Sequence, residues 1–135
     1  MRKKIIIFLT GAALCMSVAW YWYNKPRSGV ESKTTDVSVT AKDLIDKYQA
    51  TEAEANKLYL DKVIEVSGKV DDIIISENDA VIILGLQGMG GISCRFSPAT
   101  SLKKLTIKKG MLVVIKGRCT GFNIDVNLVD CIVIL

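Results

Sequence analysis

Val63-Ile64-Glu65-Val66-Ser67-Gly68-Lys69-Val70 opens a stretch that runs to Ile75 and alternates apolar with polar residues. This period of two is typical of a β-strand with one buried face, which here is predicted to hold Ile64, Val66, Gly68 and Val70. A glycine in the middle of a strand marks a tight bend or a bulge. The sequence therefore predicts one long strand over residues 63–75, bent at its glycine.

Four more strands are predicted downstream, at residues 80–87, 92–96, 111–120 and 125–135. Turn residues separate the first three strands, and a longer connector that includes residues 101–109 precedes the fourth. Five short strands need closure to protect their edges. A five-stranded OB-fold Greek-key barrel supplies that closure and places its long connection between the third and fourth strands. A small sandwich or an SH3-like barrel is the alternative within the same mainly β class.

One or two short helices are predicted before the barrel. Thr40 has the character of an N-cap, and Asp43 follows three residues later as a carboxylate for the first helical turn. Apolar residues then recur at helical spacing. The pattern predicts helices at 41–49 and 52–59, or one kinked helix, in front of the strands of a domain that covers residues 40–135.

The N-terminus combines a basic tip, residues 1–4, with an uncharged stretch over residues 5–23. As a helix these 19 residues would span about 28 Å, close to the hydrocarbon thickness of a bilayer. The aromatic run at 20–23 resembles an interfacial belt. The sequence therefore predicts a transmembrane anchor at 5–23 with the lipid bilayer as its partner, followed by a flexible linker at 24–39.

Two alternatives to an uncleaved anchor are signal-peptide cleavage and lipid attachment. Small residues before Ala19 would suit signal-peptide cleavage after Ala19, which would release a soluble domain. A lipoprotein anchored at Cys15 is disfavoured, because the bulky Leu14 stands where a small residue is needed. Each version places the domain outside the cytoplasm, and the expected location is the bacterial cell membrane, single-pass, with the domain on the extracytoplasmic side.

Charge and composition limit the classes of function that this chain could have. Residues 1–39 carry the whole net charge of +4, so residues 40–135 are electrically neutral. A nucleic-acid-binding domain usually carries a positive excess. The absence of histidine removes imidazole ligands and bases, and no serine or cysteine has an evident partner base. We therefore expect no enzyme, no metal and no cofactor.

The domain resembles a known family. Ala55-Asn56 with Tyr59, Lys62 and the run from Val66 to Val70 match the beginning of the tRNA-anti-like family of bacterial OB-fold proteins. Its later part is matched by three further stretches: residues 94–96, 116–121 and 125–131. The resemblance covers residues 40–135 and implies an OB-like fold, often behind a lipoprotein or membrane-anchor N-terminus. It implies no established activity.

Candidate ligand-binding residues follow from outward positions on the predicted barrel. If the OB ligand face is used, they are Lys69, Arg95, Lys116 and Arg118, with Phe96 or Phe122 available for stacking. A basic patch on the connector comprises Lys103, Lys104, Lys108 and Lys109. This patch is either a contact for anionic headgroups or phosphates or a solvated face that keeps the domain soluble.

Three cysteines lie in the domain, and an extracytoplasmic location permits a disulfide. The spacing favours Cys119 with Cys131, which flank one hairpin-like unit, although strand register could instead place Cys94 beside Cys131. All three could equally be small buried apolar residues.

The sequence thus predicts a non-enzymatic, membrane-anchored, extracytoplasmic OB-fold binding module. Its partner would be an unknown protein or ligand at the OB face. The alternatives are a single-stranded nucleic-acid-binding OB protein and an envelope assembly protein that contacts other membrane proteins.

Overall fold

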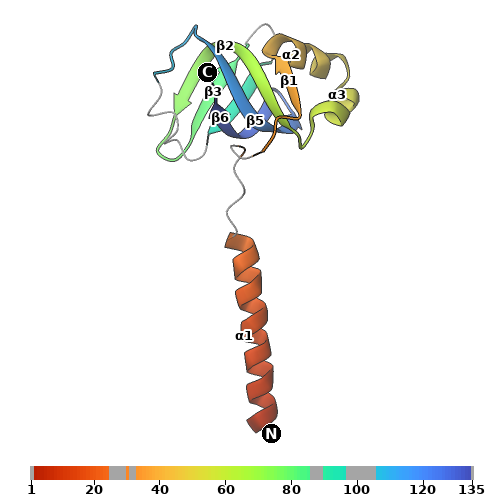
Figure 1. The fold of residues 1–135 in the computed structure, drawn as a ribbon, viewed down its shortest axis with the longest axis vertical. Helices are drawn as coiled ribbons and strands as arrows, with labels where there is room; N and C mark the ends of the chain where they lie inside the picture. The colour runs from red at the N-terminus through yellow and green to blue at the C-terminus, as the bar shows by residue number, and fades with distance from the viewer. Residues whose placement is uncertain (1, 25–29, 31–32, 86–89, 97–105, 135) are drawn as a thin grey trace.

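The computed structural model describes residues 2–24, 30, 33–85, 90–96 and 106–134 (Figure 1). Within them the chain is mainly β, with three helices. In chain order the elements are α1 (Arg2–Asn24), β1 (Val37–Thr40), α2 (Ala41–Ala50), α3 (Glu52–Tyr59), β2 (Val63–Ile75), β3 (Ala80–Leu84), β4 (Ile92–Phe96), β5 (Leu112–Phe122) and β6 (Val126–Val133).

Five of the strands close into a barrel. The sheet order is β1-β2-β3-β4-β6-β5, and an additional pairing of β2 with β5 completes the ring. Neighbouring barrel strands run antiparallel except β4 and β6, which are parallel. This topology is consistent with an OB fold. The predicted five-stranded barrel is therefore found, with strand boundaries that differ from the predicted ones by a few residues.

The barrel interior is filled by the predicted inward faces of the strands. On β2 the residues Ile64, Val66 and Val70 are buried, and β4 buries Ile92, Cys94 and Phe96 in the same alternating way. Among the described residues no polar or charged residue is buried. The alternation of period two thus identifies the core of this barrel correctly.

The long strand β2 changes partners at its glycine. Its first half pairs with β1 up to Ser67, and its second half pairs with β3 from Val70 onward. Gly68 lies between these two pairings, as expected for a bend. A Cβ atom at Gly68 would meet the Cβ of Ala41 at 2.8 Å, so only glycine lets α2 approach the strand this closely.

The predicted pair of short helices is also found. Thr40 caps α2, because its hydroxyl oxygen accepts a hydrogen bond from the Asp43 backbone N–H at 3.2 Å. Helix α2 buries Leu44, Ile45 and Tyr48 against the barrel. Residues 37–40, at the end of the predicted linker, form β1 and pair in parallel with β2.

The N-terminal stretch is helical, as α1, and the described side chains of residues 13–23 are exposed. Within the part of the chain that the structure describes, no helix combines the length and the apolar character that crossing a membrane requires. The transmembrane segment predicted at residues 5–23 is therefore not found.

Candidate ligand-binding site

Two of the predicted ligand-binding cations are engaged within the protein. The Lys116 ammonium donates a hydrogen bond to the backbone carbonyl of Lys33. The Arg118 guanidinium pairs with the Asp130 carboxylate at 3.5 Å, and both side chains are only about one-third exposed (32% and 28%). Each cation on the outer face of β5 thus already has an acceptor supplied by this chain.

The other two lie on different strands. Arg95 is exposed on β4, and Lys69 is exposed on β2 beside the bend. The four predicted residues thus come from three strands of the barrel: β2, β4 and β5.

The two aromatic side chains that were predicted for stacking face inward. Phe96 is completely buried in the barrel core. Phe122 is half-buried and stacks on the ring of Tyr48, with 5.6 Å between ring centroids. The prediction that Phe96 is available for stacking is therefore wrong. Alternate residues of β4 face the core, and Phe96 points there together with Ile92 and Cys94.

The predicted basic patch is described only in part. Lys103 and Lys104 lie outside the described residues, and Lys108 is exposed. The Lys109 ammonium lies 2.7 Å from the Asp72 carboxylate. Hydrogen bonds from Lys109 and from the Ile73 backbone hold the pKa of Asp72 below its ordinary value. One of the two described lysines of this patch is thus paired with a carboxylate.

Cys119 and Cys131 are not bonded to each other in this structure, in which both are free thiols. Cys119 lies opposite Leu128 and contacts the Tyr48 hydroxyl at 3.3 Å. Asp130 adopts a positive φ of 54° where the β5–β6 register shifts, as at a β-bulge. The thiol of Cys131 therefore faces Gly117 and Cys94.

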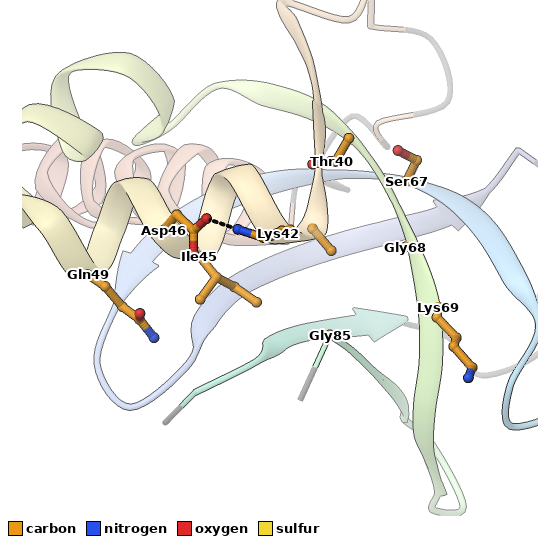
Figure 2. A pocket seen from close by; sticks show the side chains of 10 residues that line it. Thr40, Lys42, Ile45, Asp46, Gln49, Ser67, Gly68, Lys69 and Gly85 are labelled. Carbon is orange, nitrogen blue, oxygen red and sulfur yellow. Dashed lines mark hydrogen bonds and ion pairs between the residues drawn. The ribbon is translucent and has the colours of Figure 1, made fainter. Parts of the chain in front are cut away.

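A cavity of about 290 Å³ lies where β2 changes partners (Figure 2). One wall is α2 and the other is the bend of β2, and Gly85, the residue after β3, also lines the cavity. Figure 2 shows Ile45 projecting from α2 toward Gly85, and a Cβ at Gly85 would lie 3.2 Å from the Ile45 Cδ1 atom. The lining residues are Thr40, Ala41, Lys42, Ile45, Asp46, Gln49, Ser67, Gly68, Lys69 and Gly85.

The lining of this cavity, the α2 pocket, combines an apolar base with a polar rim. Ala41 and Ile45 are buried, whereas Thr40, Gln49, Ser67 and Lys69 are exposed. Lys42 forms an ion pair with Asp46 one helical turn along, and both side chains are largely exposed. Among the described contacts Lys69 has no carboxylate partner, and its side chain extends toward Gly110, where a Cβ atom would lie 3.8 Å from the Lys69 Cε atom. This lining suits a small amphipathic ligand.

Sequence reasoning found one charged residue of the pocket, Lys69, and missed the others. The only signal was Gly68, which marks the bend but not what packs against it. The pocket forms because Ala41 contacts Gly68 across 27 residues of sequence, a tertiary contact that no local pattern reveals. Among the described residues no group of cysteine, aspartate and glutamate side chains could hold a metal ion.

Comparison with known proteins identifies the family. A family model described as tRNA_anti-like matches residues 1–133, nearly the whole chain. The chain belongs to the tRNA_anti-like family. The resemblance seen in the sequence is thereby confirmed. A comparison with curated proteins gives no match.

Solved structures show the same fold. One is a Klebsiella pneumoniae lipoprotein to which nucleic-acid binding has been ascribed, with 15% identity and a TM-score of 0.59; the match covers 75% of this chain and 92% of that one. Another is a Leishmania major chain assigned as an aspartyl-tRNA synthetase, with 13% identity and a TM-score of 0.51. There the match covers 88% of this tRNA_anti-like chain but only 26% of the other. At these identities the likeness shows the fold alone.

Proposed function

We propose that this tRNA_anti-like protein is a non-catalytic binding module that takes a small amphipathic ligand in the α2 pocket. The observation that carries the proposal is the composition of that cavity: a buried apolar base beneath a polar rim that includes Lys69, which forms no ion pair with any residue that the structure describes. Its volume of about 290 Å³ is at the lower end for small-molecule sites. A compact apolar body with one carboxylate would therefore suit it.

The test is a fragment screen by NMR on the full chain in detergent, with small aromatic and aliphatic carboxylates as probes. We expect amide shifts to concentrate at residues 41–49, 67–69 and 85. Ser67→Trp should block the pocket, because Ser67 is exposed on its rim. Ser76→Trp is the matched control, since Ser76 is exposed in the β2–β3 turn and does not line the pocket. Shifts scattered over the barrel, or equal in both variants, would contradict the proposal.

We further propose that the protein acts at a membrane, with the barrel on the extracytoplasmic side. Support comes from the basic tip before an uncharged stretch, which is typical of exported chains. The exposed rings of Trp20 and Trp22 on α1, 72% and 78% accessible, suit the headgroup region. Fractionation with N-terminal sequencing tests this. Recovery from the cytosol would contradict it, and a mature terminus at Trp20 would show cleavage after Ala19.

Single-stranded nucleic-acid binding is the second candidate. It is suggested by the similarity to a lipoprotein with that ascription and by the exposed Lys108 and Arg95. The internal partners of Lys116 and Arg118 and the burial of Phe96 argue against it. A fluorescence titration with a labelled oligonucleotide at low and at moderate salt decides between the two. Salt-sensitive binding would favour nucleic acid over the pocket ligand.

An envelope assembly role is a third candidate, in which the barrel contacts another membrane protein. It differs from the first in its partner rather than in its fold. Crosslinking in intact membranes followed by affinity purification would separate the two. A single stoichiometric protein partner would favour assembly, whereas an uncrosslinked barrel with fragment binding at the α2 pocket would favour the ligand module.

A further inference from the structure

The segment before α2, residues 33–40, is attached to the barrel, and we call it the strap. At its start the Lys33 carbonyl accepts a hydrogen bond from the Lys116 ammonium. The Asp36 N–H then donates to the Val63 carbonyl at 2.8 Å, and the Asp36 carboxylate accepts from the Val63 N–H at 2.9 Å. The last part of the strap is β1, which pairs in parallel with β2. The strap is therefore bound to β2 and β5 along its length.

One carboxylate on β2 holds two hydroxyl groups of the strap. Glu65 accepts a hydrogen bond from the Thr35 hydroxyl and another, at 3.3 Å, from the Ser38 hydroxyl. Glu65 is half-buried, and every residue of the strap is half-buried or exposed. Contacts of this kind open at a lower free energy than those of a buried core. The strap should therefore detach locally while the barrel stays folded.

The end of the strap forms part of the α2 pocket. Thr40 is both the last residue of β1 and the N-cap of α2, and it is paired with Ser67 on β2. Both residues line the pocket (Figure 2). The residues that follow them, Ala41 and Gly68, make the close contact at the pocket's base. The pairing of β1 with β2 therefore sets the position of the first turn of α2.

The other end of α2 has contacts of its own. The ring of Tyr48 stacks on Phe122, with 5.6 Å between the ring centroids, and its hydroxyl lies 3.3 Å from the Cys119 sulfur. When the strap detaches, this end of the helix should keep its place while the first turn moves. That movement would separate Thr40 and Ala41 from the β2 side of the pocket.

We propose that the strap regulates the α2 pocket, which binds its ligand more tightly while β1 is paired with β2. This coupling rests on the proposed function of the α2 pocket as a ligand site. The strap leads back along the chain to α1, so a pull on α1 acts on the strap before it reaches the barrel. Because coupling between two sites is reciprocal, a bound ligand in turn stabilises the attached strap.

Two substitutions weaken the strap without changing the lining of the α2 pocket. Thr35→Val removes one of the two hydroxyl groups, and Glu65→Ala removes the acceptor of both. Thr34→Val is the matched control for the first, because Thr34 is exposed and none of the hydrogen bonds among the described residues involves its side chain. Glu77→Ala is the control for the second, since Glu77 is exposed in the β2–β3 turn.

The first measurement is NMR on the full chain in detergent without ligand. Amide exchange at Asp36 and Val63 reports on the strap and should be faster in both variants, and the amide signals of Ala41 and Gly85 should shift. Neither control should change these signals. Unchanged exchange in both variants would mean that the hydroxyl groups do not hold the strap. Faster exchange with unshifted pocket signals would mean that the strap does not reach the pocket, and either result would overturn the proposal.

The second measurement uses benzoate as the carboxylate fragment. Its Kd should be about five-fold higher in Glu65→Ala than in wild type, and should rise less in Thr35→Val, which removes one hydrogen bond. Saturating benzoate should slow amide exchange at Asp36 and Val63 in wild type by at least the same factor. Equal Kd values in variants and controls would overturn the coupling. If wild type binds no fragment at the pocket, the proposed function fails, whereas the exchange and shifts without ligand still decide whether strap and pocket are coupled.

Discussion

The two sides of β5 differ in what their residues contact. On the outer side, Lys116 and Arg118 reach a backbone carbonyl and a partly exposed carboxylate, contacts that usually contribute little to stability. On the inner side, Gly117 lies so close to β6 that a Cβ atom would meet the Cys131 sulfur at 2.7 Å and the Leu128 Cβ at 3.3 Å. The charged residues stand out in the sequence, yet the inconspicuous glycine between them has the tighter environment.

The α2 pocket repeats this contrast. Its rim holds Lys69 and the Lys42–Asp46 pair, all exposed. Its shape depends instead on Gly68, where helix and strand come within contact distance. We infer that close approach through glycine determines the geometry of this barrel, while most of its charges are replaceable. The predictions below test this inference.

The largest effect is expected for Gly117→Ala. The added methyl group would have to displace a core sulfur and a neighbouring strand, both fixed by the barrel, at a cost of about 3 kcal/mol. Urea unfolding of the full chain in detergent measures it as a lower midpoint. Gly11→Ala is the control, because a Cβ at Gly11 has no atom within 4 Å. A midpoint for Gly117→Ala equal to that of the control would refute the role of close approach.

Gly68→Ala should have a smaller effect, of about 1–2 kcal/mol, because the clash is with Ala41 on α2, and a helix can shift more readily than a barrel strand. The same shift should change the α2 pocket, so carboxylate fragments should bind more weakly. Ser67→Ala, on the rim beside it, should stay within about 0.5 kcal/mol of wild type. Unchanged fragment affinity in Gly68→Ala would mean that the pocket does not depend on this contact.

The strands and the helix α2 could be predicted from the sequence, whereas the contacts at the candidate sites could not, for a physical reason. Alternation on β2 and β4 and the cap at Thr40 are local patterns, so they are visible in the sequence. The partners of Arg118 and Cys131 depend on the register shift beside Asp130, whose positive φ of 54° is not encoded by a glycine. The pairing of β1 with β2 spans 27 residues, so the alternation at 37–39 alone does not reveal it.

Tyr48→Phe should cost about 1 kcal/mol, because it removes the hydroxyl contact with Cys119 at 3.3 Å. Burial first, and then this contact, raise the pKa of Tyr48 above its ordinary value of 10.0. A raised pKa in the folded state means that this stability is present below about pH 10 and is lost as pH rises further. Unfolding midpoints between neutral and alkaline pH should fall less steeply in Tyr48→Phe than in wild type. Parallel curves would show that the hydroxyl titrates normally.

The smallest loss of stability is expected for a substitution on the outer face of β5. The same variant also tests where the ligand binds. Arg118→Gln removes a pair with Asp130 that is about one-third exposed, so the loss should stay below about 1 kcal/mol. A double-mutant cycle with Asp130→Asn measures the coupling itself. Carboxylate fragments should bind Arg118→Gln as they bind wild type, because Arg118 does not line the α2 pocket. If Arg118→Gln instead lost fragment binding while Ser67→Trp kept it, the ligand would bind on the outer face of β5. The charged face, and not the pocket shaped by Gly68, would then be the functional region.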